Sequence, residues 1–215
     1  MGIDVTPTSD VPQLDDRPIK ELAVFFDMYR AEFIPVYADV IAFLDDKPDE
    51  TLYEIEQMLS HIDKVFDFML DEETRLKNVD KAVGHLERAI LDCLKILWIE
   101  INRKVNLIYN DGSRRKYCVN MSEREFTQKY MEYNKLLSEA RRTEMESVGV
   151  SPSKSIPEYK NAIRLGKELL ESIDDDKLNN FSFFSRVLMW KSQALAFVLG
   201  FAASLLASYL YGSLQ

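Results

Sequence analysis

The sequence predicts an all-α protein, an antiparallel helical bundle of about five helices followed by one C-terminal transmembrane helix. Apolar residues recur at spacings of three and four in five successive segments, and this spacing places them on one face of an α-helix. Seven glycines and seven prolines in 215 residues are too few for a turn-rich all-β fold. Residues 194–211 form an apolar run of 18 residues without charge or proline, which is long enough to suggest a membrane span.

These patterns divide the chain into three parts. Residues 1–16 contain two prolines and several aspartates and are expected to be a flexible N-terminal arm. Residues 17–180 carry the five amphipathic segments and are expected to form a cytosolic helical bundle. Residues 181–215 are expected to be a juxtamembrane segment and the transmembrane anchor.

The first two helices are expected between Asp16 and the acidic residues near position 71. Pro35 must kink or split the first helix, because proline lacks the backbone N–H and clashes with the preceding turn. Asp49 is expected to cap the second helix. The residues predicted to form its buried face are Leu52, Ile55, Leu59, Ile62, Phe66 and Met69.

A third helix is expected to begin at Asn78 or Asp80 and to be central to the bundle, because apolar residues cover about half of its circumference. Its main apolar stripe comprises Val83, Leu86, Ile90, Leu94, Leu97, Ile101, Val105 and Ile108. A turn at 110–113 and a loop with the basic cluster 114–116 are expected to follow. That cluster is predicted to be either a solvated loop or a contact for phospholipid head groups.

The fourth helix is expected after Ser122, because Ser122 and Glu125 have the spacing of a capping box. Its predicted buried face comprises Phe126, Tyr130, Tyr133, Leu137 and Ala140. Residues 149–157, with two prolines and three serines, are predicted to be a loop or hinge. The fifth helix is expected from about Pro157 to Ile173.

The flanks of the apolar run predict how it would sit in a bilayer. Its predicted membrane-interface anchors are Arg186, Trp190, Lys191, Tyr209 and Tyr211. Aromatic residues are enriched at both interfaces, and basic residues mark the cytosolic side. The protein is therefore expected to be a tail-anchored, single-pass membrane protein with its N-terminal domain in the cytosol. The competing interpretation is a buried core helix.

Small residues recur at every fourth position of this run and predict a helix-association face: Ala196, Gly200, Ser204, Ser208 and Gly212. Small residues at this spacing let two helix backbones approach closely within a membrane. The expected partners are the lipid bilayer and either a protein partner or a second copy bound through the membrane helix.

The charge distribution argues against nucleic acid as a partner. The chain has 27 basic and 36 acidic residues, and only Arg186 and Lys191 lie beyond residue 180. Residues 1–180 therefore have 25 basic and 36 acidic residues, a net charge of −11, whereas nucleic-acid interfaces are basic. No sequence motif indicates a catalytic, cofactor-binding or metal site, and no cofactor is expected. The two cysteines, Cys93 and Cys118, are expected to be reduced thiols.

Three functional hypotheses follow from these patterns. The first is a non-enzymatic interaction or adaptor protein that binds a protein partner at a membrane. The second is a membrane-acting effector whose helical body senses a signal and whose tail oligomerises to permeabilise the membrane. The third is a membrane-tethered enzyme with no recognisable motif, whose site would be assembled from scattered residues such as His85, Glu87 and Asp92.

Overall fold

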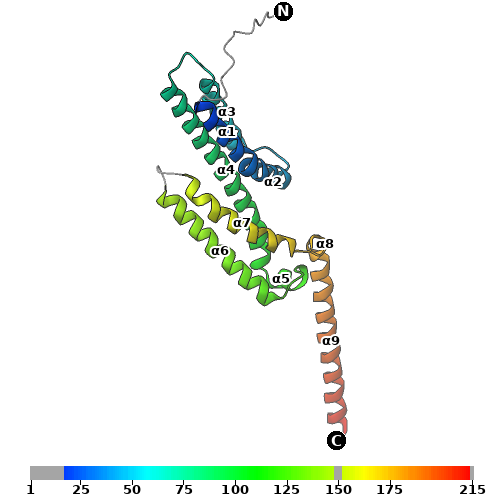
Figure 1. The fold of residues 1–215 in the computed structure, drawn as a ribbon. Helices are drawn as coiled ribbons and strands as arrows, with labels where there is room; N and C mark the ends of the chain where they lie inside the picture. The colour runs from blue at the N-terminus through cyan, green and yellow to red at the C-terminus, as the bar shows by residue number, and fades with distance from the viewer. Residues whose placement is uncertain (1–16, 148–151, 214–215) are drawn as a thin grey trace, which may run out of the picture.

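The computed structural model describes residues 17–147 and 152–213 (Figure 1). Side chains are not described for residues 152, 182, 184, 188, 189, 192, 195, 202 and 205–213. The described residues are helical and contain no β-strand, although one isolated antiparallel bridge joins Val119 to Ile173. The all-α prediction is therefore confirmed.

The described residues form nine α-helices and two short segments of other helical types, where about five helices and an anchor were expected. In chain order they are α1 Arg17–Met28, the π-helical η1 Tyr29–Phe33, α2 Ile34–Leu44, α3 Asp49–Val65, α4 Glu72–Tyr109, α5 Gly112–Cys118, α6 Glu123–Glu146, the 3-10 helix η2 Pro152–Ser155, α7 Ile156–Glu171, α8 Asp175–Asn179 and α9 Phe181–Ser213.

Helix α4 is the centre of the body, as its apolar pattern predicted. It contacts α1, α2 and α3 along its first part and α5 and α7 along its second part (Figure 1). Helix α6 packs on α7. The α4 side chains buried in these contacts include Leu86, Ala89, Ile90, Cys93, Leu94, Leu97, Ile101, Val105 and Ile108. Helices from the N-terminal and the C-terminal parts of the chain thus cover apolar side chains on more than one face of α4.

Pro35 does not interrupt the helical path. Helices α1, η1 and α2 follow one another without a gap, and Pro35 lies in the first turn of α2. The residues just before it, Tyr29–Phe33, take the wider π-helical form. Because proline removes one hydrogen bond from the helix ladder, the π-helical turn changes the bonding pattern at the place where that bond is missing.

The start of α4 lies earlier than the sequence suggested. Asp71 is its N-cap and accepts a hydrogen bond at 2.8 Å from the backbone N–H of Thr74. The acidic residues at 71–73 therefore begin this helix, where they favourably face the positive end of the helix dipole. The prediction that they end the preceding helical pattern, and that α4 starts at Asn78 or Asp80, was wrong.

The predicted buried face of α3 was right only in part. The side chains buried against α4 are Thr51, Met58 and Val65, and the N-cap is Pro48 instead of Asp49. The predicted residues divide into two sets: Ile55 and Ile62 are half-buried, whereas Leu52, Leu59, Phe66 and Met69 are exposed. Each buried residue of α3 thus directly precedes a residue that was predicted to be buried, so the helix turns a neighbouring face toward α4.

Helices α6 and α7 agree closely with the sequence. Ser122 caps α6 by accepting a hydrogen bond at 3.2 Å from the N–H of Glu125. The four buried α6 residues Phe126, Tyr133, Leu137 and Ala140 were all predicted, and Tyr130 is half-buried. Helix α7 has Pro157 in its first turn. Residues 149–151 of the predicted hinge lie outside the described part of the chain, and its remainder forms η2 and the first turn of α7.

Gly166 of α7 lies where α7 packs tightly against both α4 and α6. A Cβ atom at this position would lie 2.7 Å from Cγ2 of Ile101 and 2.8 Å from Cε2 of Tyr133. Both neighbours are fully buried core residues, so neither can move without disturbing the packing.

We predict that Gly166→Ala destabilises the protein by about 1–3 kcal/mol through overpacking, although alanine favours helices. The control is Gly84→Ala in α4, where the nearest atom to an added Cβ is the flexible end of Arg88 at 3.6 Å. That substitution should be neutral or stabilising by up to about 1 kcal/mol. Urea unfolding followed by circular dichroism measures both, and equal stability of the two variants would contradict the close packing.

Candidate functional site

Helix α9 leaves the body instead of packing along it (Figure 1). Its first residue, Phe181, lies under the guanidinium group of Arg114 in α5, with 5.4 Å between the guanidinium carbon and the ring centroid. Helix α9 also contacts α8. The N-cap of α8, Asp174, accepts a hydrogen bond from the N–H of Lys177 at 3.0 Å. These contacts tie the base of α9 to the body and leave the following turns projecting.

Apolar side chains are exposed on more than one side of the projecting part. The exposed fractions are 75% for Phe197, 60% for Val198, 62% for Leu199 and 59% for Phe201. Successive residues of an α-helix differ by about 100° in direction, so Phe197, Val198 and Leu199 point to three different sides. Phe201 lies on the same side as Phe197 and stacks on it with 6.5 Å between the ring centroids. A helix with such broad apolar exposure is normally buried in a large core or in a membrane.

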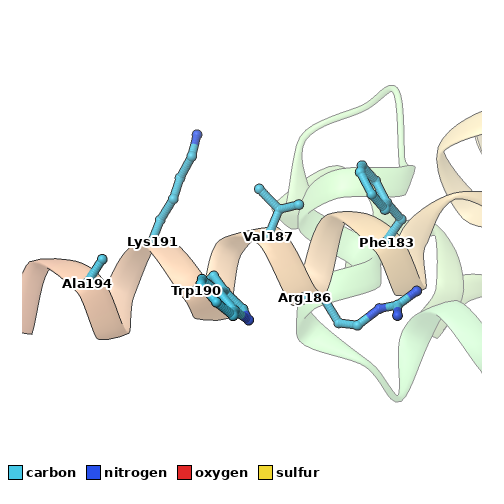
Figure 2. A pocket seen from close by; sticks show the side chains of 6 residues that line it. All are labelled: Phe183, Arg186, Val187, Trp190, Lys191 and Ala194. Carbon is cyan, nitrogen blue, oxygen red and sulfur yellow. The ribbon is translucent and has the colours of Figure 1, made fainter.

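The first turns of α9 carry a mixed aromatic and basic surface. Figure 2 shows its six lining residues, which are Phe183, Arg186, Val187, Trp190, Lys191 and Ala194. All six come from α9 itself, and Lys191 extends away from the helix axis (Figure 2). This is an open hollow along one helix, so it does not enclose a small molecule. It contains the three predicted interface anchors Arg186, Trp190 and Lys191.

The predicted helix-association face is open where it is described. Ala196, Gly200 and Ser204 are exposed, and a Cβ atom added at Gly200 would meet no atom within 4 Å. The structure therefore leaves room for another helix to approach these three residues. The side chains of Ser208, Tyr209 and Tyr211 lie outside the described part, as does the environment of Gly212.

Among the described residues, no helix combines the length and the apolar character that crossing a membrane requires. The predicted span 194–211 includes positions 195, 202 and 205–211, whose side chains lie outside that part. The transmembrane assignment of this run therefore stays a prediction.

A polar cluster lies between α3 and α4. Nδ1 of His85 is 2.7 Å from Oε2 of Glu54, and Nε of Arg88 is 3.0 Å from the same oxygen. Nη2 of Arg88 also lies 2.7 Å from Nδ1 of His85. One imidazole nitrogen cannot both donate to Glu54 and accept from Arg88. We assign the Nδ1 proton to the His85–Glu54 bond, because Arg88 already reaches the carboxylate through Nε.

His61 continues this cluster along α3. Its ring stacks on that of His85 with 5.3 Å between centroids, and its Nδ1 lies 2.9 Å from Oδ1 of Asn78. The amide of Asn78 in turn donates to the carbonyl oxygen of Thr74 at 2.8 Å. The polar side chains named here therefore have partners within the body, and they fix the pairing of α3 with α4.

The residues of the enzyme hypothesis do not converge on one site. His85 and Asp92 are seven residues apart and share one side of α4, about 10 Å apart along the axis, whereas Glu87 lies on the opposite side. Burial raises the pKa of Asp92, an effect that the nearby Lys95, 3.9 Å away, opposes. Within the described residues, no group of three or more histidine, cysteine, aspartate or glutamate side chains could hold a metal ion.

Both cysteines are buried free thiols. Burial raises the pKa of Cys93 to about 11, and its Sγ lies 3.5 Å from the hydroxyl oxygen of Thr51. Burial also raises the pKa of Cys118. A nucleophilic cysteine needs a lowered pKa and access to substrate, so the environments of these two thiols favour a packing role.

The basic cluster 114–116 forms part of helix α5 instead of the expected loop. Arg115 donates to the carbonyl oxygen of Tyr109 and lies 3.2 Å from the carboxylate of Glu123. Arg114 lies 3.5 Å from the carboxylate of Asp111 and contacts Phe181. Two of the three bases thus bind within the body, which leaves little net positive charge for lipid head groups.

The fold and these surfaces define a helical body with a projecting apolar helix. No family model, curated protein or solved structure matches this chain.

The α3–α4 cluster generates a prediction about stability. Glu54 is only 14% exposed, and its carboxylate contacts both His85 and Arg88. Glu54→Ala should destabilise the protein by about 1–3 kcal/mol, because it leaves the half-buried imidazole of His85 without its acceptor. The control is Glu73→Ala in the first turn of α4, whose pair with Lys77 is largely exposed, so this change should destabilise the protein much less than Glu54→Ala. Chemical unfolding measures both, and an unchanged Glu54→Ala midpoint would show that the cluster does not hold α3.

Proposed function

We propose that this protein is a non-enzymatic interaction module that α9 anchors in a membrane, with the helical body in the cytosol. The observation that carries the proposal is the exposure of Phe197, Val198, Leu199 and Phe201 around the projecting helix. In water this exposure is costly, since burying one such side chain contributes about 1.5–3 kcal/mol. Four of them would contribute on the order of 6–12 kcal/mol on entering lipid.

The dimensions of α9 support the same proposal. Its 33 residues span about 50 Å at 1.5 Å per residue. A bilayer core is about 30 Å thick, and the uncharged run 194–211 would cover about 27 Å of it. The preceding turns, with Trp190 and Lys191, would then lie in the head-group region, where aromatic rings and lysine side chains are favourable.

We propose that the body binds protein, and its charge argues against two other kinds of partner. The net charge of −11 over residues 1–180 disfavours nucleic acid and anionic lipid. The open face at Ala196, Gly200 and Ser204 is proposed as a second contact, with a partner helix or a second copy within the membrane.

We predict that Leu199→Arg weakens the retention of the protein in membranes. A charge near the middle of a spanning helix costs about 2.5–3.5 kcal/mol on insertion scales. Wild-type protein should resist an alkaline carbonate wash of the membranes, whereas a clearly larger fraction of the variant should be extracted. The control Met131→Arg changes an exposed apolar residue of α6 and should leave the membrane fraction unchanged. Extraction of the wild-type protein by the wash would refute the anchor.

The association face generates a separate prediction. The double variant Gly200→Ile with Ser204→Ile should weaken self-association in a membrane two-hybrid assay about tenfold, because bulky side chains separate the backbones. The open space around Gly200 means that the change does not disturb the body. Val198→Phe adds bulk on the opposite side of α9 and should have no effect. If both variants associate like wild type, the small residues do not form the contact.

A further inference from the structure

The exposed side of α3 and its C-cap carry a regular apolar stripe that nothing in the described body covers. Leu52 and Leu59 of α3 and Phe66, its C-cap, are 40%, 56% and 47% exposed and recur at intervals of seven residues. Residues seven apart in a helix lie on the same face about 10 Å apart. The half-buried Ile55 and Ile62 connect this stripe to the interface with α4. We call Leu52, Leu59 and Phe66 the α3 stripe.

One edge of the α3 stripe is acidic with the same period. Asp49, Glu56 and Asp63 are exposed and also recur at intervals of seven residues. Around the helix axis, the direction of each acid differs by about 40–80° from that of the neighbouring stripe residues, on the side away from α4. This is the position of the charged residues that flank the apolar seam of a coiled coil and select its partner.

The structure assigns this surface to a partner helix with apolar residues at coiled-coil spacing and lysine or arginine along the matching edge. The inference rests on the proposed function, because it names the surface through which the body would bind its partner. The apolar seam would supply affinity by burial, and the acidic edge would select a basic partner over an acidic one.

Charge disfavours the two occupants that the chain itself could supply. In an antiparallel pair of two copies, the acidic edges would face each other. In a parallel pair, each acidic edge would face the Ile55–Ile62 side of the other copy, which offers no cation on α3. Residues 1–16 contain four aspartates, no lysine and no arginine, so they also have the wrong charge for this edge.

The position of α3 also suits a partner from the cytosol. It lies along the first part of α4, and α9 projects from the opposite end of the body (Figure 1). A partner helix could therefore bind the α3 stripe without contacting the membrane that α9 is proposed to enter.

The test uses the full chain in non-ionic detergent and two fluorescein-labelled helical peptides of three heptads each. Both peptides have leucine at the seam positions; one has lysine along the edges, and its twin has glutamate. Fluorescence anisotropy should show that the lysine peptide binds at least about tenfold more tightly than the glutamate peptide. Binding to micelles is common to all protein variants and is subtracted.

Two variants and one control identify the surface. Leu59→Gln should weaken binding of the lysine peptide about tenfold, and Glu56→Lys with Asp63→Lys should reverse the preference between the peptides. Met131→Gln, an equally exposed apolar position on α6, should change neither. All these positions are exposed, so folding is expected to persist, and circular dichroism checks it.

Three outcomes would overturn the inference. Equal binding by wild type and Leu59→Gln would show that the α3 stripe is not the site. Unchanged preference in the double lysine variant would remove the role of the acidic edge. A dimer in sedimentation that Leu59→Gln abolishes would show that a second copy occupies the stripe. None of these results depends on carbonate extraction, so failure here is distinct from failure of the anchor.

Discussion

Helix α4 has 38 residues and buries apolar side chains on more than one face, so no single neighbour can remove it from water. Helices α1, α2 and α3 cover its first part, and α7 with α6 behind it covers the second. Because the two sets come from opposite ends of the sequence, one continuous core joins them. Ion pairs from Lys160 to Glu32 and from Lys167 to Asp39 also connect α7 to η1 and α2.

Sequence spacing predicts the buried faces of α4 and α6 well. In both helices the widest apolar stripe is the buried one, although each also makes polar contacts with its neighbours. Helix α3 differs because Thr51, Glu54 and His61 bind Cys93, His85 and Asn78 of α4. These polar contacts lie beside the apolar stripe and rotate it partly into solvent, and a hydrophobic pattern contains no information about such cross-helix pairs.

The candidate site on α9 illustrates a different limit of sequence reasoning. Periodicity assigns a face only to an amphipathic helix. The exposed apolar residues of α9 do not gather on one face, so length and charge were the informative features. Geometry adds that, among the described residues, the base of the helix contacts the body through Phe181 against Arg114 and through α8. The sequence could not indicate this, because a buried core helix and a projecting helix can have the same composition.

The two apolar surfaces of this protein also differ in what they can bind. Helix α9 carries only Arg186 and Lys191 as charges, so lipid can surround most of it. The α3 stripe has acids along one whole edge, and desolvating three carboxylates in lipid would cost more than burying three apolar side chains returns. A basic protein helix can neutralise that edge while covering the stripe. Helix α4 alone is about 57 Å long, well beyond the screening length of about 8 Å at physiological salt. The acidic edge of the α3 stripe therefore determines which partner binds there, independently of the charge on a membrane around α9.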